Sequence, residues 1–186
     1  MNYPSAMQSV LRLDESIYPA IMASKKTVRY CMANVLVFGL LHAFFSLLFS
    51  NALLAESQLS SQLPLATKGV FLLIGVAVAF FMHAGASLFL WVFTRGIGGD
   101  TAFFPVYFNF GISFVGLWPL APVLAAAQAG LQGPALQVLL GLASAYGLAV
   151  ILFAAKNASG LSLTKIILAL IVTIIFIACF LYLWIG

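Results

Sequence analysis

The sequence predicts an all-α, polytopic transmembrane helical bundle with five spanning helices. Only 12 of the 186 residues are Asp, Glu, Lys or Arg, whereas about a quarter of the residues of a soluble domain are charged. Hydrophobic residues make up 64% of the chain, so it lacks the polar surface that water would require. The charged residues fall between long apolar runs, and a helix needs about 20 apolar residues to cross a bilayer. Together these observations identify lipid as the solvent.

Five apolar runs define the expected spans. Backbone polar groups in lipid must pair within their own segment, so each run is expected to be a helix. The linkers are too short for a water-soluble domain, which leaves a cytoplasmic or interfacial segment, 1–29, and a five-helix transmembrane domain, 30–186. The runs are 30–54, 68–94, 101–126, 134–155 and 163–185, and Pro119 and Pro122 interrupt the third.

The N-terminal segment mixes apolar and charged residues. This mixture is typical of a helix that lies on the cytoplasmic leaflet, and we expect that helix to break at Pro19. A partly ordered tail is the alternative. The first apolar run begins only near residue 30 and has full spanning length, so the segment is not expected to be a cleaved signal peptide.

Basic residues predict the orientation. With the N-terminus in the cytoplasm and the C-terminus outside, seven basic residues lie inside and only Lys68 lies outside, as the positive-inside rule requires. We therefore expect an integral protein of the bacterial cytoplasmic (inner) membrane, in contact with the bilayer and with other integral membrane proteins. No basic face interleaved with aromatic residues indicates a nucleic-acid partner. The inner residues are Arg12, Lys25, Lys26, Arg29, Arg95, Lys156 and Lys165.

The apolar runs contain few groups that could support chemistry. The intramembrane polar residues of interest are His42, His83 and Asn109. No carboxylate lies deep within a run, which counts against a proton-coupled carrier, and no hydrolase, metalloprotease or phosphate-loop motif is present. The two cysteines, Cys31 and Cys179, are expected near opposite faces of the membrane, without a disulfide or a metal. We predict no catalytic residue, no cofactor and no enzyme.

The two histidines share a predicted depth. His42 follows Arg29 by 13 residues and His83 precedes Arg95 by 12, which places both roughly 18–20 Å from the cytoplasmic basic residues. Two histidines at one depth on neighbouring helices could ligate a b-type haem or line a permeation path. The simpler expectation is one hydrogen bond from each histidine to a neighbouring helix, and we expect Asn109 to act in the same way.

The segment Arg95-Gly96-Ile-Gly98-Gly99-Asp100 is the most distinctive linker. Its glycines predict a tight cytoplasmic turn, with Asp100 placed to cap the third helix. Contact with an anion such as a lipid phosphate is an alternative role. Small residues also cluster at 84–87, at 111–116 and at 141–147, and such clusters let helix backbones approach closely.

Several stretches resemble the Yip (Ypt-interacting protein) family of five-helix membrane proteins. They are Phe81-Met-His83-Ala-Gly-Ala-Ser-Leu-Phe, then Arg95-Gly-Ile-Gly-Gly-Asp-Thr-Ala-Phe-Phe104, then a third helix that ends in Trp118-Pro119, and Asn157-Ala-Ser-Gly-Leu-Ser-Leu-Thr-Lys165 before the last helix. The resemblance implies five helices and a cytoplasmic N-terminus. This chain lacks the long polar N-terminal region of eukaryotic members, so the resemblance suggests a bacterial-type member and counts against Rab-type GTPase binding. No catalytic residue carries over.

These observations favour a non-enzymatic integral membrane protein. It would act through contacts with membrane proteins or lipids, in membrane organisation or as an accessory subunit of a larger membrane complex. A small permease or channel subunit that uses His42, His83 and Asn109 is the first alternative. A haem-bearing electron-transfer subunit with His42 and His83 as ligands is the second.

Overall fold

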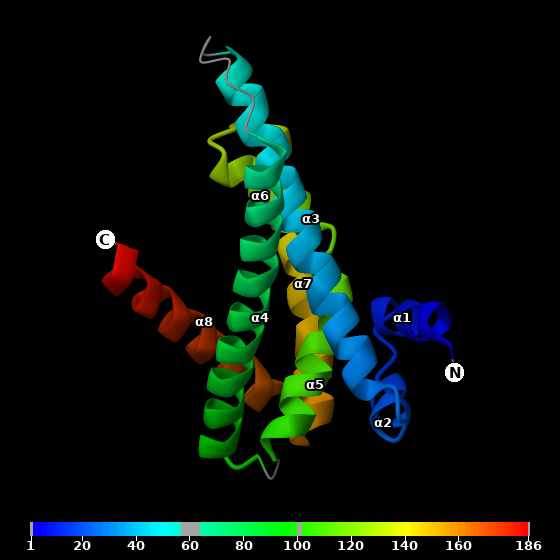
Figure 1. Cartoon of the computed structure of the whole chain (residues 1–186). Coiled ribbons are helices and arrows are strands. Elements are labelled where there is room, and N and C mark those ends of the chain that lie inside the picture. The colour runs from blue at the N-terminus through cyan, green and yellow to red at the C-terminus, as the bar shows by residue number, and fades with distance from the viewer. Residues whose placement is uncertain (1, 57–63, 100–101, 186) are drawn as a thin grey trace.

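A computed structural model describes residues 2–56, 64–99 and 102–185. The described residues are helical with short turns and contain no strand, so the all-α prediction is confirmed. Long helices form an elongated bundle, with two short N-terminal helices on one side and the last helix leaving on another (Figure 1). The elements are α1 (Tyr3–Leu11), α2 (Ile17–Met22), α3 (Thr27–Glu56), α4 (Leu65–Gly96), α5 (Phe103–Ser113), the 3₁₀ turn η1 (Phe114–Leu117), α6 (Leu120–Gln128), α7 (Pro134–Ser159) and α8 (Leu163–Ile185).

Three of these helices are long and apolar enough to cross a membrane. They are α3, α4 and α7. The expected third run, 101–126, is instead a broken element, because α5 and η1 meet α6 at an angle of 74°. Pro119 and Pro122 explain the break, since proline removes a backbone donor and clashes with the preceding turn. The described residues thus contain three candidate spans by length and composition, or four if the bent pair counts as one.

Helices α3 and α4 approach closely through small residues. A β-carbon added at Gly39 of α3 would lie 2.9 Å from the β-carbon of Ala79 in α4. A β-carbon added at Gly75 of α4 would likewise overlap the side chain of Ala43 in α3. Each helix therefore presents a pair of small residues four positions apart, as in the packing of transmembrane helices through small residues.

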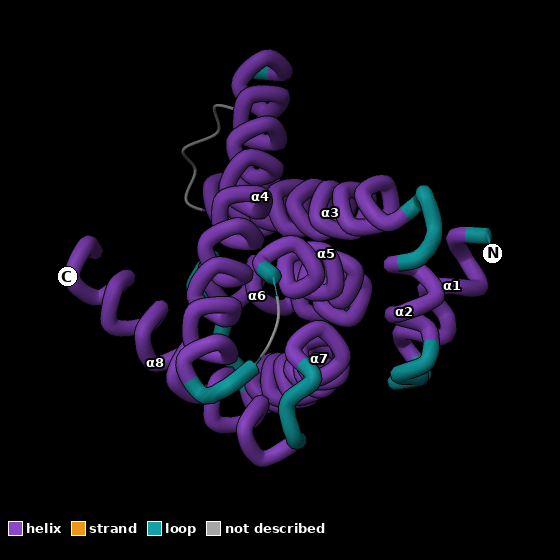
Figure 2. The backbone as a smooth tube through the Cα atoms, turned by 90° about the horizontal axis from the view of Figure 1, so that it is seen from below, coloured by secondary structure: helices purple, strands orange, loops and turns teal. Residues whose placement is uncertain are grey.

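Helix α5 occupies the centre of the bundle, between α3, α4 and α7 (Figure 2). A β-carbon at Gly116 would lie 2.7 Å from Val150 of α7, and one at Gly147 of α7 would lie 2.5 Å from Leu117. The clusters at 111–116 and 141–147 thus pack helices together, as expected. By contrast, a β-carbon added at Gly85 or at Gly141 would have no neighbour within 4 Å. Gly85 of the cluster at 84–87 therefore does not bring two helix backbones together.

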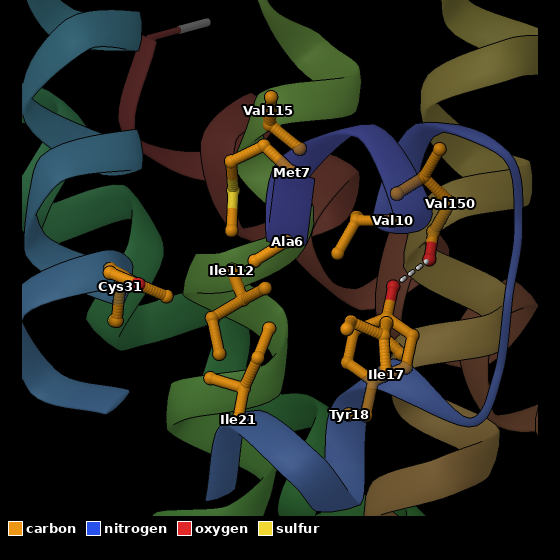
Figure 3. Close-up of a cluster of buried hydrophobic side chains, with 12 residues drawn as sticks. Ala6, Met7, Val10, Ile17, Tyr18, Ile21, Cys31, Ile112, Val115 and Val150 are labelled. Carbon is orange, nitrogen blue, oxygen red and sulfur yellow. Dashed lines mark hydrogen bonds between the residues drawn. The ribbon is translucent and has the colours of Figure 1, made fainter. Parts of the chain in front are cut away.

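The N-terminal segment packs on the bundle. The buried residues of α1 and α2 form one core with residues of α3, α5 and α7 (Figure 3). The apolar face that we expected to lie on the leaflet is therefore covered by protein. The break between the helices also differs from the expected one: it falls between Leu11 and Ile17, while Pro19 lies in the first turn of α2, where a missing backbone donor costs little. The N-terminal members of this core are Ala6, Met7, Val10, Ile17, Tyr18 and Ile21.

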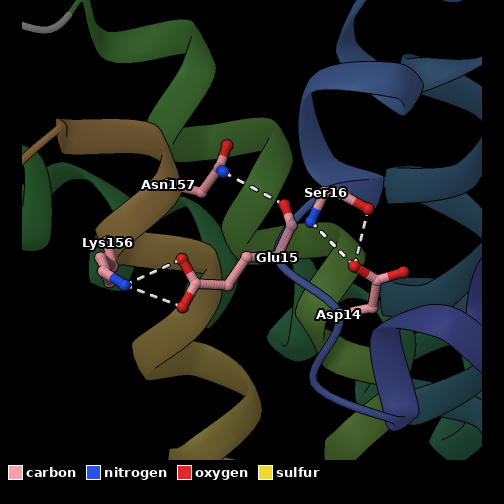
Figure 4. Close-up of polar contacts among 5 residues, drawn as sticks. All are labelled: Asp14, Glu15, Ser16, Lys156 and Asn157. Carbon is pink, nitrogen blue, oxygen red and sulfur yellow. Dashed lines mark hydrogen bonds and ion pairs between the residues drawn. The ribbon is translucent and has the colours of Figure 1, made fainter.

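Polar contacts attach the same segment to α7. Lys156 forms an ion pair with Glu15, with an N–O distance of 2.8 Å, and the side chain of Asn157 donates to the Glu15 carbonyl at 3.2 Å (Figure 4). Ten residues before Lys156 in α7, the Tyr146 hydroxyl donates to the carbonyl of Leu11 at 2.7 Å. These contacts hold α1 and α2 against the bundle.

Helix α8 leaves the bundle soon after it begins (Figures 1 and 2). Ile166 and Ala169, near its start, are buried against α4 and α7, and Phe176 contacts Phe89 of α4 with ring centroids 4.7 Å apart. Residues on its opposite side, including Leu168 and Ile175, are exposed. One side of α8 thus packs on the bundle and the other lies open along the helix.

Candidate functional site

Asn34 carries a buried polar side chain that forms hydrogen bonds to two other helices. It lies fully buried on α3, one turn above the buried Tyr30. Its amide nitrogen donates to the Ile112 carbonyl of α5 at 2.8 Å, and its Oδ1 accepts from the Tyr3 hydroxyl of α1 at 2.5 Å. The indole Nε1 of Trp118 donates to the Asn34 backbone carbonyl at 3.2 Å. Asn34 therefore joins the N-terminal segment, α3 and the centre of the bundle at one point.

Sequence reasoning missed Asn34. The signal was present, because a lone asparagine stands early in the first apolar run, where a polar group needs a partner. Its partners are a carbonyl 78 residues away and a hydroxyl 31 residues away, and neither separation leaves a local pattern.

His83 lies fully buried on α4 among aromatic rings. Its Nε2 faces the carbonyl of Tyr107 on α5 at 3.0 Å. Its ring stacks on Phe110 at a centroid distance of 5.8 Å, and Phe114 meets it edge-on at 5.3 Å. Gly111 makes room for this arrangement, because a β-carbon there would lie 2.8 Å from Nε2 and would overlap the Cys31 sulfur. The geometry is that of a histidine that links α4 to α5.

Three buried polar atoms lack a hydrogen-bond partner in the described part of the chain. They are Nδ1 of His83, Oγ of Ser87 and Oδ1 of Asn109, which lie on α4 and α5. A buried polar atom without a partner costs about 1–3 kcal/mol. Asn109 was expected to link helices, and its side-chain oxygen Oδ1 makes no hydrogen bond among the described residues, whereas Asn34 does link helices.

His42 lies near the middle of α3. Its Nε2 lies 2.9 Å from Oε1 of Gln128 on α6. Its ring stacks on Phe38, and Phe38 in turn meets Phe114 edge-on with centroids 5.4 Å apart. His42 thus links α3 to α6, and Gln128 is a second polar partner that the sequence reasoning did not single out.

The two histidines do not share a ligand site. Phe114 touches both His83 and Phe38, and Phe38 touches His42, so these two rings connect the histidines. Each Nε2 faces a different helix, toward Tyr107 and Gln128 respectively. A bis-histidine haem needs both rings to coordinate one iron, and this arrangement does not provide that geometry.

The glycine turn closes α4 with a Schellman motif. Gly98 has a φ of +95°, its N–H donates to the Arg95 carbonyl at 3.1 Å, and the Gly99 N–H donates to the Thr94 carbonyl at 2.8 Å. Lys165 of α8 donates to the Ile97 carbonyl at 3.3 Å. Arg95 lies near the Trp91 ring, 6.0 Å from its centroid, and Gly96 has no neighbour within 4 Å of an added β-carbon. Asp100 lies outside the described residues, and α5 has Ala102 as its N-cap residue.

Ionisable groups of the N-terminal segment have altered pKa values. Burial raises the pKa of Tyr18 well above its ordinary value near 10, and the nearby Glu15 and Tyr146 add to the effect. Burial also raises the pKa of Tyr3, and the nearby Tyr30 raises it further. At the exposed Asp14, hydrogen bonds from Ser16 lower the pKa of the carboxyl group. Tyr3 and Tyr18 thus act as neutral hydrogen-bond donors.

The polar side chains of Asn34, His83 and His42 serve to join helices. Among the described residues, no three His, Cys, Asp or Glu side chains come together in a group that could hold a metal ion. Comparison with known proteins adds no assignment. No protein-family model, curated protein or solved structure matches this chain.

Proposed function

We propose that this chain is a non-enzymatic integral membrane protein of the Yip-like, five-helix type, acting through contacts with other membrane proteins or with lipids. It would cross the bacterial cytoplasmic membrane five times, with its N-terminus in the cytoplasm and its C-terminus outside. The bent pair α5–α6 would supply the fourth span and α8 the fifth. In this role it would organise the membrane or serve as an accessory subunit of a larger complex.

The observation that supports this proposal best is the path of α8. The helix packs on the bundle through one stripe, which includes Ile166, Ala169 and Thr173, and then diverges from it (Figure 1). Leu168, Ile171 and Ile175 recur at helical spacing on the opposite side and are exposed. A spanning helix with two apolar sides, of which its own bundle covers one, offers the other to a second membrane protein.

Site-specific photo-cross-linking in intact membranes tests this proposal. A benzophenone amino acid at Leu168 or Ile175 of α8 is expected to capture one discrete protein. The matched control is Leu142 of α7, which is 64% exposed against 53% and 56% for the two α8 positions. We expect only lipid adducts there. The same set of adducts at all three positions would refute a protein-binding role for α8.

One observation favours the permease alternative. Nδ1 of His83, Oγ of Ser87 and Oδ1 of Asn109 are buried without a partner in the described residues, and a polar solute or water chain would supply one. Flux assays in proteoliposomes test this alternative. Transport that is lost in Asn109→Leu but kept in His42→Gln would support it over the contact-based function.

A further inference from the structure

A pocket lies between the first turn of α1 and the N-terminal part of α3. Its volume is about 510 Å³. The residues that matter here are Lys26, Arg29, Tyr30, Ala33, Val37 and Trp118. The pocket belongs to the surface that forms when the N-terminal segment docks, since Tyr3 of α1 also lines it and bonds to Asn34.

The polarity of the pocket changes along α3. Lys26 and Arg29 stand at the end of the bundle that also carries Arg95, Lys156 and Lys165. Val37 lies eight residues beyond Arg29, about 12 Å deeper along the helix. The pocket is thus cationic at its outer end and apolar at its inner end.

Trp118 forms part of the apolar end. Its Nε1 already donates to the Asn34 carbonyl at 3.2 Å, so it presents its ring rather than a free donor to the pocket. Ala33 lies between the charged end and Val37 and leaves space beside the helix. This end suits a hydrocarbon chain and offers little to a small hydrophilic anion.

Arg29, at the cationic end, is available to a negatively charged partner. The two carboxylates of the N-terminal segment are engaged elsewhere, because Glu15 pairs with Lys156 and Asp14 accepts from Ser16. Arg29 is exposed and forms no ion pair within the described residues. Basic residues at a membrane surface attract anionic lipid headgroups, and arginine pairs well with phosphate.

We propose that this pocket binds one anionic phospholipid. Its phosphate would lie at Lys26 and Arg29, and the upper part of an acyl chain would follow Ala33 and Val37 toward the Trp118 ring. Free phosphate would leave the apolar end empty, and a zwitterionic lipid would bring no net charge to the cations. The lipid would contact both α1 and α3. This inference deepens the proposed function, on which it rests for the membrane setting, by naming the lipid class.

Quenching of Trp118 fluorescence tests the proposal. The protein carries three tryptophans, so Trp91→Phe and Trp184→Phe leave Trp118 as the sole reporter. This parent is reconstituted in vesicles that contain brominated phosphatidylglycerol or brominated phosphatidylcholine. We expect quenching at a far lower mole fraction of phosphatidylglycerol, with no reversal by millimolar inorganic phosphate. Equal quenching by both lipids, or reversal by phosphate, would overturn the proposal.

Matched variants locate the binding to the pocket. Lys26→Gln with Arg29→Gln is expected to reduce the preference for phosphatidylglycerol about 25-fold, at about fivefold per cation. Arg12→Gln with Lys25→Gln removes the same charge from exposed positions near this end and should keep most of the preference. An equal loss in both pairs would show general surface attraction and would contradict a site.

A third variant leaves the charge unchanged. Ala33→Phe fills the middle of the pocket and should weaken quenching by phosphatidylglycerol while Lys26 and Arg29 remain. Unchanged quenching in Ala33→Phe would contradict an acyl chain in the pocket. Thermal unfolding shows whether each variant is folded. If the double variant of Lys26 and Arg29 does not fold, the single variant Arg29→Gln takes its place. Cross-linking at Leu168 reports on the proposed function separately, so loss of lipid selectivity with intact cross-linking would refute the lipid site alone.

Discussion

Gly75 of α4 packs directly on Ala43 of α3, where a β-carbon on the glycine would overlap the alanine side chain. One turn farther along α4 and one turn earlier on α3, Ala79 and Gly39 repeat the relationship with the partners reversed. The two longest helices are thus held together by two reciprocal contacts between small residues. Packing of this kind matters in lipid, where apolar burial between helices supplies little driving force.

Substitution of Gly75 is expected to separate α3 from α4. Gly75→Ala should lower the free energy of unfolding by about 1–3 kcal/mol, since the added methyl group overpacks the contact. Gly85→Ala, in the same helix but with no neighbour within 4 Å, should be neutral or stabilising by about 0.5–1 kcal/mol. Thermal unfolding in mild detergent measures both. Equal melting temperatures for the two variants would show that this contact is not tight.

The Schellman turn makes Gly98 and Gly99 sensitive for different reasons. Gly98→Val should cost at least about 1 kcal/mol because its φ is +95°. Gly99→Val should cost a similar amount, because a β-carbon there would lie 2.7 Å from the Thr94 carbonyl oxygen. Expression level and thermal stability report the loss. Gly96→Ala serves as the control, and wild-type stability in both valine variants would mean that the turn is an ordinary loop.

Asn34 should matter more than the other buried asparagine. Asn34→Leu leaves the Tyr3 hydroxyl and the Ile112 carbonyl unpaired, so we expect a loss of about 1–3 kcal/mol. Asn109→Leu removes a side chain whose Oδ1 has no partner in the described residues, and it should cost less. The comparison uses thermal unfolding together with proteolysis of the N-terminal segment, which should become cleavable in Asn34→Leu. A larger loss in Asn109→Leu would contradict the central position of Asn34.

The histidines are expected to join helices without a cofactor. His42→Gln should lose about 0.6 kcal/mol, the average for a hydrogen bond between membrane helices. His83→Gln should lose more, because His83 also packs against Phe110 and Phe114. The purified protein should show no strong absorption band in the haem region. A haem spectrum that either substitution abolishes would support the electron-transfer alternative instead.

Labelling of single cysteines tests the proposed orientation. Ser60 and Gly186 lie outside the described residues, and their sidedness follows from the sequence alone. In a background without Cys31 and Cys179, Ser60→Cys and Gly186→Cys should react with an impermeant reagent in intact cells. Gly96→Cys and Ser162→Cys should react only after the membrane is opened. Labelling of the second pair in intact cells would reverse the topology.

The sequence by itself determined that this protein is all-helical, with apolar helices long enough to span a membrane. A chain with 6% charged residues and long apolar runs has to satisfy its backbone within helices, whatever its tertiary arrangement. The same local logic predicted a tight turn at the glycines and the interruption of the third run, because glycine and proline act on their own backbone. It also identified His42 and His83 as polar residues within apolar runs that need a partner.

Only the tertiary structure decided which surfaces meet. Gly39 and Gly75 pack helices together while Gly85 and Gly141 face open space, and nothing local distinguishes these glycines, because in lipid almost every face of a helix is apolar. Asn34 became central, and Asn109 did not, through the positions of carbonyl and hydroxyl groups on other helices. The N-terminal segment has an amphipathic sequence that suits a lipid surface or a protein surface equally well. Docking on α5 and α7 was settled by shape and by contacts such as Lys156 with Glu15, whose residues lie 141 positions apart.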